Sequence, residues 1–391
     1  MLFRLQDFTV ARERYDHAMR AAASLLLVAC QTHAPVASRV EVAAPKSSSS
    51  AASSAEPAAL HQPSSSLAVV ARFAQEVTVA VFPLGHDALV SQASATAWSA
   101  TALDRDNRPT SMIVRPGAHF EIFQAGGSSA TNAWITTMDE NAFPTIRFET
   151  WHVDGASATK RDARFLVVGE LRPGQWVALP SHLLPAYLYD EVPSKFENVA
   201  GAADVPKVPS AIRLTQVAFL GDGHVCAVGI TKKASGGFDM VAWNDEGGDV
   251  TLGFDDAAQG ANVARGRGGE CIVLRPHAKT TDVGRFHGGS IAWSTIDWRA
   301  ARVSAAPSGT LWLWDDERRE LARTTNADAS TLTRFEMPRD VPECPHLDDV
   351  TSIAATSDDD ALLAVRGACT NEGAALVRTS PRVPIQKFPA P

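Results

Sequence analysis

The sequence predicts an all-β fold, on three observations. From Leu67 onward, long helical periodicity is absent. The same region contains short runs of Val, Ile, Leu, Phe and Trp, interrupted roughly every 8–12 residues by Gly, Asp, Asn and Pro, as in strands joined by turns. Many of these interruptions share one form, in which a Gly or Asp turn precedes an alternating apolar strand.

Turn-and-strand segments of this form recur at a similar spacing. They follow Gly85, Gly117, Gly174, Gly223, Gly269, Gly309 and Asp360, and they read HDALVS, AHFEIF, QWVALP, HVCAVG, ECIVLR, TLWLWD and ALLAVR. The intervals between these turn residues are 32, 57, 49, 46, 40 and 51, with a mean of about 46. Repeats of this length are typical of β-propellers, whose blades are four-stranded sheets. We therefore expect a propeller of six to eight blades over residues 67–391. The alternative is a pair of β-sandwich-like domains divided near residues 199–209.

Two longer units support the propeller. Residues 214–245 and 350–380 each run as strand, tight turn, strand, loop and strand. Both resemble the middle strands of WD-repeat propeller blades. Residues 308–315 (SGTLWLWD) resemble the third strand of such a blade, which ends in a Trp-Asp pair. Counted as a third strand, this segment departs from the alignment above, and no unit carries the Gly-His element that usually accompanies the pair.

The N-terminal region has the features of an export signal. Arg20 precedes an apolar stretch that ends in Leu27-Val28-Ala29-Cys30, and this tetrapeptide resembles the lipobox of bacterial lipoproteins. The resemblance implies that residues 1–29 are a signal peptide with a short helix. It also implies that the Cys30 thiol carries a lipid anchor. The alternative is an N-terminal amphipathic helix with an incidental buried cysteine.

Two further features refine this expectation. Residues 1–18 are mixed in charge, unlike the start of a signal peptide, so we expect translation to begin at Met19. Gln31 stands where an inner-membrane retention signal often has Asp. By resemblance to such lipoproteins, the expected location is the cell envelope, with the outer membrane favoured if the organism has one.

Residues 30–66 form the expected linker. Between His33 and Ser66 the chain is mostly Ala, Ser and Pro, with serines throughout residues 47–50. Such a stretch buries too little apolar surface to offset the entropy lost on ordering. We expect a disordered linker that holds the β-rich body away from the membrane.

The other cysteines are Cys226, Cys271, Cys344 and Cys369, an even number in an expected oxidising compartment. Four cysteines allow three pairings, which the sequence alone does not distinguish. Our first choice is Cys344 with Cys369, because two cysteines so close in the sequence would cross-link a single β unit. Cys226 and Cys271 would then form the second pair. A zinc site is the less favoured alternative, because no Cys-x-x-Cys pair is present.

The charge balance bears on partners. The formal net charge is −8, which argues against a nucleic-acid partner, because such a partner requires a basic face. The stretch Arg265-Gly266-Arg267-Gly268-Gly269 is a single copy in an acidic chain, and we interpret it as a Gly-rich turn. No run is long and apolar enough to cross a bilayer.

No catalytic motif stands out, so the candidate site is a set of turn residues. His86 and Asp87 share one turn, Asp222 and His224 share another, and His287 follows Phe286. If the blades close into a ring, equivalent turns could converge on one face and bring these side chains to a ligand.

Clustered carboxylates at residues 255–256, 315–317 and 358–360 would be the place for Ca²⁺. They lack the alternate spacing of a dedicated calcium loop. We interpret them as solvated turns and expect no metal or other cofactor.

Two functions remain open. The first is a tethered, non-catalytic binding or scaffold module for a protein, peptide or glycan partner in the envelope. The second is an envelope hydrolase or lyase with its site in the central channel. Its hallmark would be His, Asp or Glu side chains from at least three blades in one pocket. We favour binding; fold alone does not decide between the two.

Overall fold

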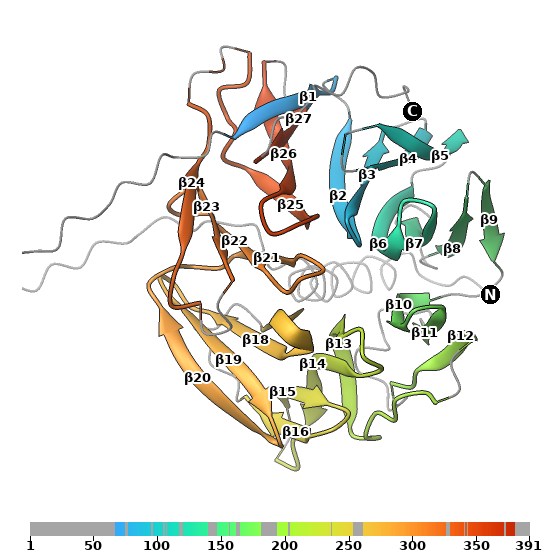
Figure 1. The fold of residues 1–391 in the computed structure, drawn as a ribbon, viewed down its shortest axis with the longest axis vertical. Helices are drawn as coiled ribbons and strands as arrows, with labels where there is room; N and C mark the ends of the chain where they lie inside the picture. Colours follow the sequence, from blue (N-terminus) through green and yellow to red (C-terminus); the bar gives the residue numbers. More distant parts are fainter. Residues whose placement is uncertain are drawn as a thin grey trace, which may run out of the picture.

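The apolar runs of the sequence form antiparallel strands, and the strands form sheets arranged in a ring (Figure 1). The structure is a computed structural model of the 391-residue chain. It describes residues 67–379 except 75–76, 95–96, 105, 107, 117–119, 140–146, 156, 162–164, 181–193, 202–203, 236, 253–260, 326–328, 340, 342 and 371–372. The expected signal peptide, Cys30 and the linker lie outside the described residues, as do Gly117 and the carboxylates at 255–256.

Within the described residues the strands make seven sheets, called blades one to seven here. The strands of blades one to three are β2 (Thr78–Leu84), β3 (Asp87–Ala93), β4 (Ala97–Leu103), β5 (Pro109–Pro116); β6 (Phe120–Ser129), β7 (Asn132–Asp139), β8 (Arg147–Asp154), β9 (Ser157–Arg161); and β10 (Phe165–Arg172), β11 (Gln175–Pro180), β12 (Glu197–Ala200). Those of blades four and five are β13 (Ile212–Phe219), β14 (Val225–Lys232), β15 (Phe238–Asn244), β16 (Gly248–Thr251); and β17 (Asn262–Arg265), β18 (Cys271–Pro276), β19 (Thr281–His287), β20 (Ser290–Ile296). Those of blades six and seven are β21 (Arg302–Ala305), β22 (Leu311–Asp315), β23 (Glu320–Thr324), β24 (Thr333–Glu336); and β25 (Val350–Ala355), β26 (Ala361–Cys369), β27 (Gly373–Arg378) with β1 (Ala68–Arg72).

The ring is closed by its two ends. The N-terminal strand β1 pairs antiparallel with β27, with Val69 opposite Val377, so the outer strand of blade seven comes from the start of the body. In Figure 1, β1 (blue) lies beside β27 (red). The protein is therefore a β-propeller, as the repeat period predicted, and the two-sandwich alternative is wrong. It has seven blades, within the expected range of six to eight. The proposed division near residues 199–209 begins at the end of β12 in blade three and precedes β13 of blade four.

Each blade interface holds its own hydrophobic cluster. Seven clusters of buried side chains are found in the described residues, each shared by two neighbouring blades. The second strand of a blade supplies both of its interfaces. In β22, Leu311 and Leu313 face blade five, whereas Trp312 and Trp314 face blade seven. Burial on both faces explains why β22 is continuously apolar, where an alternating strand was expected.

The turn alignment located the second strands. Six of its seven segments form β3, β11, β14, β18, β22 and β26. The segment after Gly117 was misplaced, because it leads into β6, the first strand of blade two. The equivalent strand, β7, begins at Asn132. The β6–β7 turn contains Ala130 and Thr131 and therefore lacked the Gly or Asp signal.

The Trp-Asp pair lies in a different strand of its blade from the one expected. Trp314 and Asp315 end β22, which is the second strand of blade six, so the expected third-strand position is wrong. Asp315 lies in the hydrophobic interior, 1% exposed. Its carboxylate accepts backbone N–H bonds from Arg299, Glu317 and Arg318 at 3.0–3.1 Å. This carboxylate therefore anchors the turn, and it is not the solvated group expected from the sequence.

Both disulfides have the expected pairing. Cys226 of β14 is bonded to Cys271 of β18, which links the second strands of blades four and five. Cys344 is bonded to Cys369 of β26, which ties the loop before β25 to blade seven. Among the residues that the structure describes, no helix has the length and apolar character to cross a membrane.

Candidate functional site

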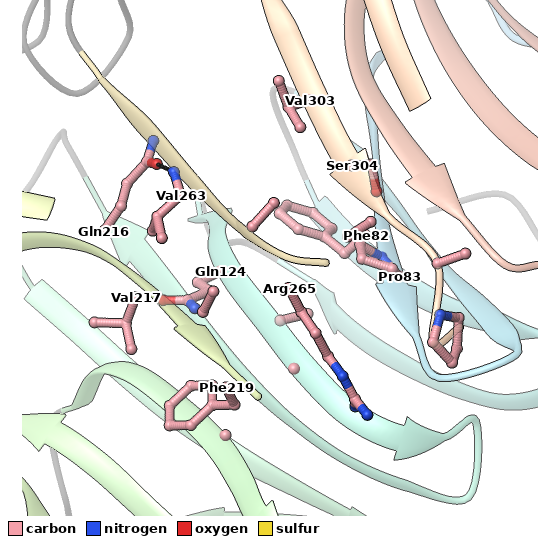
Figure 2. A pocket seen from close by; sticks show the side chains of 18 of the residues that line it. Phe82, Pro83, Gln124, Gln216, Val217, Phe219, Val263, Arg265, Val303 and Ser304 are labelled. Atoms are coloured by element: carbon pink, nitrogen blue, oxygen red, sulfur yellow. Dashed lines mark hydrogen bonds between the residues drawn. The ribbon is translucent and has the colours of Figure 1, made fainter. Parts of the chain in front are cut away.

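A cavity of about 810 Å³ lies at the centre of the ring. All seven inner strands (β2, β6, β10, β13, β17, β21 and β25) contribute residues to its wall. Figure 2 shows Gln124, Phe219 and Arg265 lining this space from three different blades. A concave site to which every blade contributes is a candidate binding site.

Polar side chains in the wall bond neighbouring inner strands to one another. The Gln216 amide donates to Asn262 Oδ1 at 3.0 Å and accepts the backbone N–H of Val263 at 3.2 Å. Ser304 Oγ accepts the N–H of Ala355, and Ser352 Oγ accepts the N–H of Val81, at 3.0 and 2.8 Å. Inner strands expose backbone groups along one edge, and these bonds satisfy some of them.

Arg265 differs from these residues. It ends β17 and is partly exposed to the cavity. Its Nε is buried without a hydrogen-bond partner. Within the described part of the chain, no hydrogen bond or ion pair reaches any other atom of its guanidinium.

The position of Arg265 depends on a glycine in the neighbouring blade. Gly221 has a φ of +87°, and a methyl group there would lie 2.5 Å from Arg265 Nη1. The Arg265 side chain of blade five therefore lies against the β13–β14 turn of blade four. A side chain at position 221 would both strain the backbone and displace the guanidinium.

The other two arginines of the wall have structural partners. Arg172 Nε donates to the Asp222 carbonyl at 2.9 Å, which fastens β10 to the same β13–β14 turn. Arg302 Nε donates to the Val350 carbonyl at 2.6 Å, across the boundary between blades six and seven. Both arginines thus hold neighbouring blades together.

Apolar side chains form another part of the wall. Phe82, Phe219, Val217, Val263 and Val303 line the cavity and are labelled in Figure 2. The ring of Phe219 lies over Gly169 of β10 so closely that a methyl group at Gly169 would be 2.0 Å from it. The cavity therefore combines aromatic and aliphatic surface with one unpaired cation.

Of the turn residues expected to face a ligand, four lie in two equivalent turns, β2–β3 and β13–β14, whereas His287 precedes the β19–β20 turn between a third and a fourth strand. His86 lines the cavity, and its Nδ1 lies 3.2 Å from the Thr356 carbonyl of blade seven. Asp87 accepts the N–H of Ala130 in blade two at 2.8 Å. Both contacts join blade one to a neighbour.

The second pair belongs to the β13–β14 turn. Asp222 Oδ1 accepts the His224 N–H at 3.1 Å. The His224 ring lies 3.2 Å from Asp245 and 3.1 Å from Glu246 in its own blade. His287 ends β19, where its carbonyl accepts the Ser290 hydroxyl. A ligand-facing role for these five residues stays a prediction.

The carboxylates of the remaining cluster, residues 358–360, interact with other side chains of the protein. Hydrogen bonds from Ser308 and Thr310 lower the pKa of Asp358, outweighing its burial. Asp360 is paired with Arg378 at 2.6 Å. In the described ranges, no three His, Cys, Asp or Glu side chains are grouped so as to hold a metal ion.

Acid–base groups are few in the cavity. Among its described lining residues, His86 and Glu170 are the only His, Asp or Glu side chains. Glu170 Oε1 accepts the Gly174 N–H at 2.7 Å. These two groups come from two blades, so the described wall does not contain the three-blade constellation that was the expected hallmark of an enzyme in the channel.

The sequence did not single out Arg265 as a site residue. The Gly-rich turn expected around it is present, with a short 3₁₀ helix at Arg267–Gly269. One signal was available: Arg265 ends an apolar run directly before a second-strand turn, as Arg172 does in β10, whereas β13, β21 and β25 end in Phe or Ala. That signal becomes informative only when the first strands are known to line one cavity.

No known family model matches the sequence, and no curated protein matches it. Solved structures with a similar chain path include the β-propeller domain of the Trilobed protease from Pyrococcus furiosus, with 10% identity, a TM-score of 0.46 and coverage of 78% of this chain and 93% of that chain. The α-L-arabinanase of Penicillium chrysogenum in complex with arabinobiose has 8% identity, a TM-score of 0.42 and coverage of 81% and 98%. A chain of the mitotic checkpoint complex has 9% identity, a TM-score of 0.45 and coverage of 87% and 98%. These levels of likeness indicate neither a family nor a function, and the propeller assignment here follows from the strand order itself.

Proposed function

We propose that this protein is a non-catalytic binding module of the cell envelope that takes its ligand in the central cavity. The observation that carries the proposal is the composition of the cavity wall. It has aromatic and aliphatic surface, but only two His, Asp or Glu side chains among its described residues, and Glu170 is already hydrogen bonded. Such a wall suits binding through apolar contact and a few polar groups.

The partner is a protein segment, a peptide or a glycan. An envelope hydrolase or lyase is the less favoured function, because acid–base chemistry needs positioned carboxylates or histidines around the substrate. Nucleic acid is disfavoured by the net charge of −8.

The proposed location rests on the N-terminal sequence. A lipidated Cys30 followed by an Ala/Ser/Pro-rich linker would hold the propeller at a membrane surface and leave the cavity open to partners. Outer-membrane sorting is proposed for an organism that has such a membrane.

The binding proposal is tested by filling the cavity. Gln124 lines it, and its side chain has no hydrogen-bond partner among the described residues. Gln124→Trp would therefore reduce the volume without removing an internal bond. Thr159→Trp on the exposed face of β9 is the matched control. Peptide and glycan arrays probed with both variants and the parent protein should show ligands that only Gln124→Trp has lost. Ligands bound equally by all three proteins, or turnover of a bound glycan or peptide, would contradict the proposal.

The anchor is tested separately. Mass spectrometry of the mature N-terminus should find an acylated peptide that begins at Cys30, and Cys30→Ala should leave the membrane fraction. Unmodified residues preceding Cys30 in the mature protein would contradict the proposed anchor and envelope location.

A further inference from the structure

Arg265 has the features of a ligand-binding cation. An arginine that serves the fold is normally paired, because an unpaired buried donor forfeits its hydrogen bonds with water. Arg172 and Arg302 follow this rule, with carbonyl partners in neighbouring blades. The buried Nε of Arg265 has no such partner, and its side chain is held in the cavity wall against Gly221.

The surrounding charge favours an anion. Three arginines and one glutamate line the cavity, in a protein whose overall net charge is −8. The described wall therefore has a local excess of positive charge that the whole molecule lacks. A guanidinium presents its donors in a planar fork that matches a carboxylate or a phosphoryl group.

The apolar part of the wall defines the remainder of the ligand. Phe82 and Phe219 line the same space as Arg265 (Figure 2). We propose that Arg265 binds the oxyanion, a carboxylate or a phosphoryl group, of an organic ligand whose apolar portion packs against these aromatic rings. This inference rests on the proposed function and specifies the chemistry of its ligand.

The test uses paired probes on the full chain. Benzoate and phenyl phosphate carry the two oxyanions on an aromatic group, and benzamide is the neutral counterpart of benzoate. Calorimetric titration should show that the parent protein binds one of the anions at least ~10-fold more tightly than benzamide, as expected when a charge-assisted hydrogen bond is gained. The anion that binds more tightly identifies the oxyanion class.

Two variants assign the effect to this residue. Arg265→Gln should lose at least the same ~10-fold preference. Arg339→Gln, which makes the same charge change at an exposed position, should retain it. Equal binding of benzamide, an anion preference that survives Arg265→Gln, or no binding of either anion at millimolar concentration would overturn the inference.

Stability gives a readout that does not depend on the probes. In a buffer whose only anion is chloride, Arg265→Met should leave the thermal midpoint unchanged or raise it, because the change removes an unsatisfied buried donor. A lowered midpoint would show that Arg265 serves the fold and would overturn the inference. An array ligand that is lost in Gln124→Trp but retained in Arg265→Gln would refute the oxyanion role alone and leave the binding function in place.

Discussion

At the residue scale, the side chain of Asp282 stabilises blade five through hydrogen bonds to neighbouring strands. It lies in β19 and accepts hydrogen bonds from Arg275 of β18 at 2.7 Å, from His277 at 2.8 Å and from Thr295 of β20 at 2.7 Å. Burial by itself raises the pKa of Asp282, but these hydrogen bonds outweigh burial and lower the pKa from 3.8 to about 2. The ionised carboxylate thus joins three strands of blade five.

The lowered pKa has a consequence for acid stability. A carboxylate with a depressed folded-state pKa stabilises the protein above its unfolded pKa, and this contribution is lost as the pH falls through the folded value. We expect Asp282→Asn to reduce the free energy of unfolding by about 2 kcal/mol at pH 7. The difference from the parent should shrink between about pH 4 and pH 2. Urea unfolding at several pH values measures this difference. Asp297→Asn, at an exposed ion pair, should have little effect at any pH.

The sequence around Arg265 does not identify this residue as a site residue. Its neighbours in sequence, Gly266 and Arg267, indicate only a turn. Its lack of a partner is a property of the cavity, which forms when residues from all seven inner strands meet. His86 and His224 were selected because histidine often acts as an acid, a base or a ligand. In the structure, however, His86 contacts the Thr356 carbonyl and His224 contacts Asp245.

At the scale of elements, the second strand of each blade was the most predictable part. It follows a tight turn, and in blades four to seven it is buried on both faces, so a Gly or Asp followed by an apolar run marks it. The outer strands were less visible: β9 is largely exposed and reads SATKR. A strand that buries little surface carries little hydrophobic signal.

The disulfide between β14 and β18 cross-links two neighbouring blades across their interface. It closes a loop of 45 residues, for which chain entropy predicts a stabilisation of roughly 2–4 kcal/mol. We expect the double variant Cys226→Ala, Cys271→Ala to lose about this amount in urea unfolding under oxidising conditions.

Reducing agent provides the control for that experiment. It should destabilise the parent by more than the double variant, which retains only the Cys344–Cys369 bond. Four free thiols in the untreated parent, together with stability that reducing agent does not change, would show the pairing to be absent.

At the scale of the whole molecule, ring closure depends on β1. This strand covers the edge of β27 and brings buried Leu67 and Val70 into the clusters on either side of blade seven. Without β1, the edge of β27 would offer unpaired backbone groups to other chains.

Truncation tests the closure. Deleting residues 1–77 should lower the free energy of unfolding by roughly 3–6 kcal/mol, from the loss of two buried aliphatic side chains. It should also cause self-association in size-exclusion chromatography with light scattering. Deleting residues 1–66 leaves all described strands in place and should have neither effect. Equal behaviour of the two truncations would refute the role of β1 in closure.

The all-β class, the repeat period and the positions of six second strands could be predicted from the amino-acid sequence alone. The sequence also led to the disulfide pairing, although spacing left three pairings open. These features depend on residues within one blade or between neighbours, where apolar runs and turns have a direct physical meaning. The number of blades, the closure of the last blade by β1 and the unpaired Arg265 in a shared cavity became evident only in the assembled ring. These features arise when the ends of the chain and all seven inner strands meet, and such contacts leave no periodic signal along the sequence.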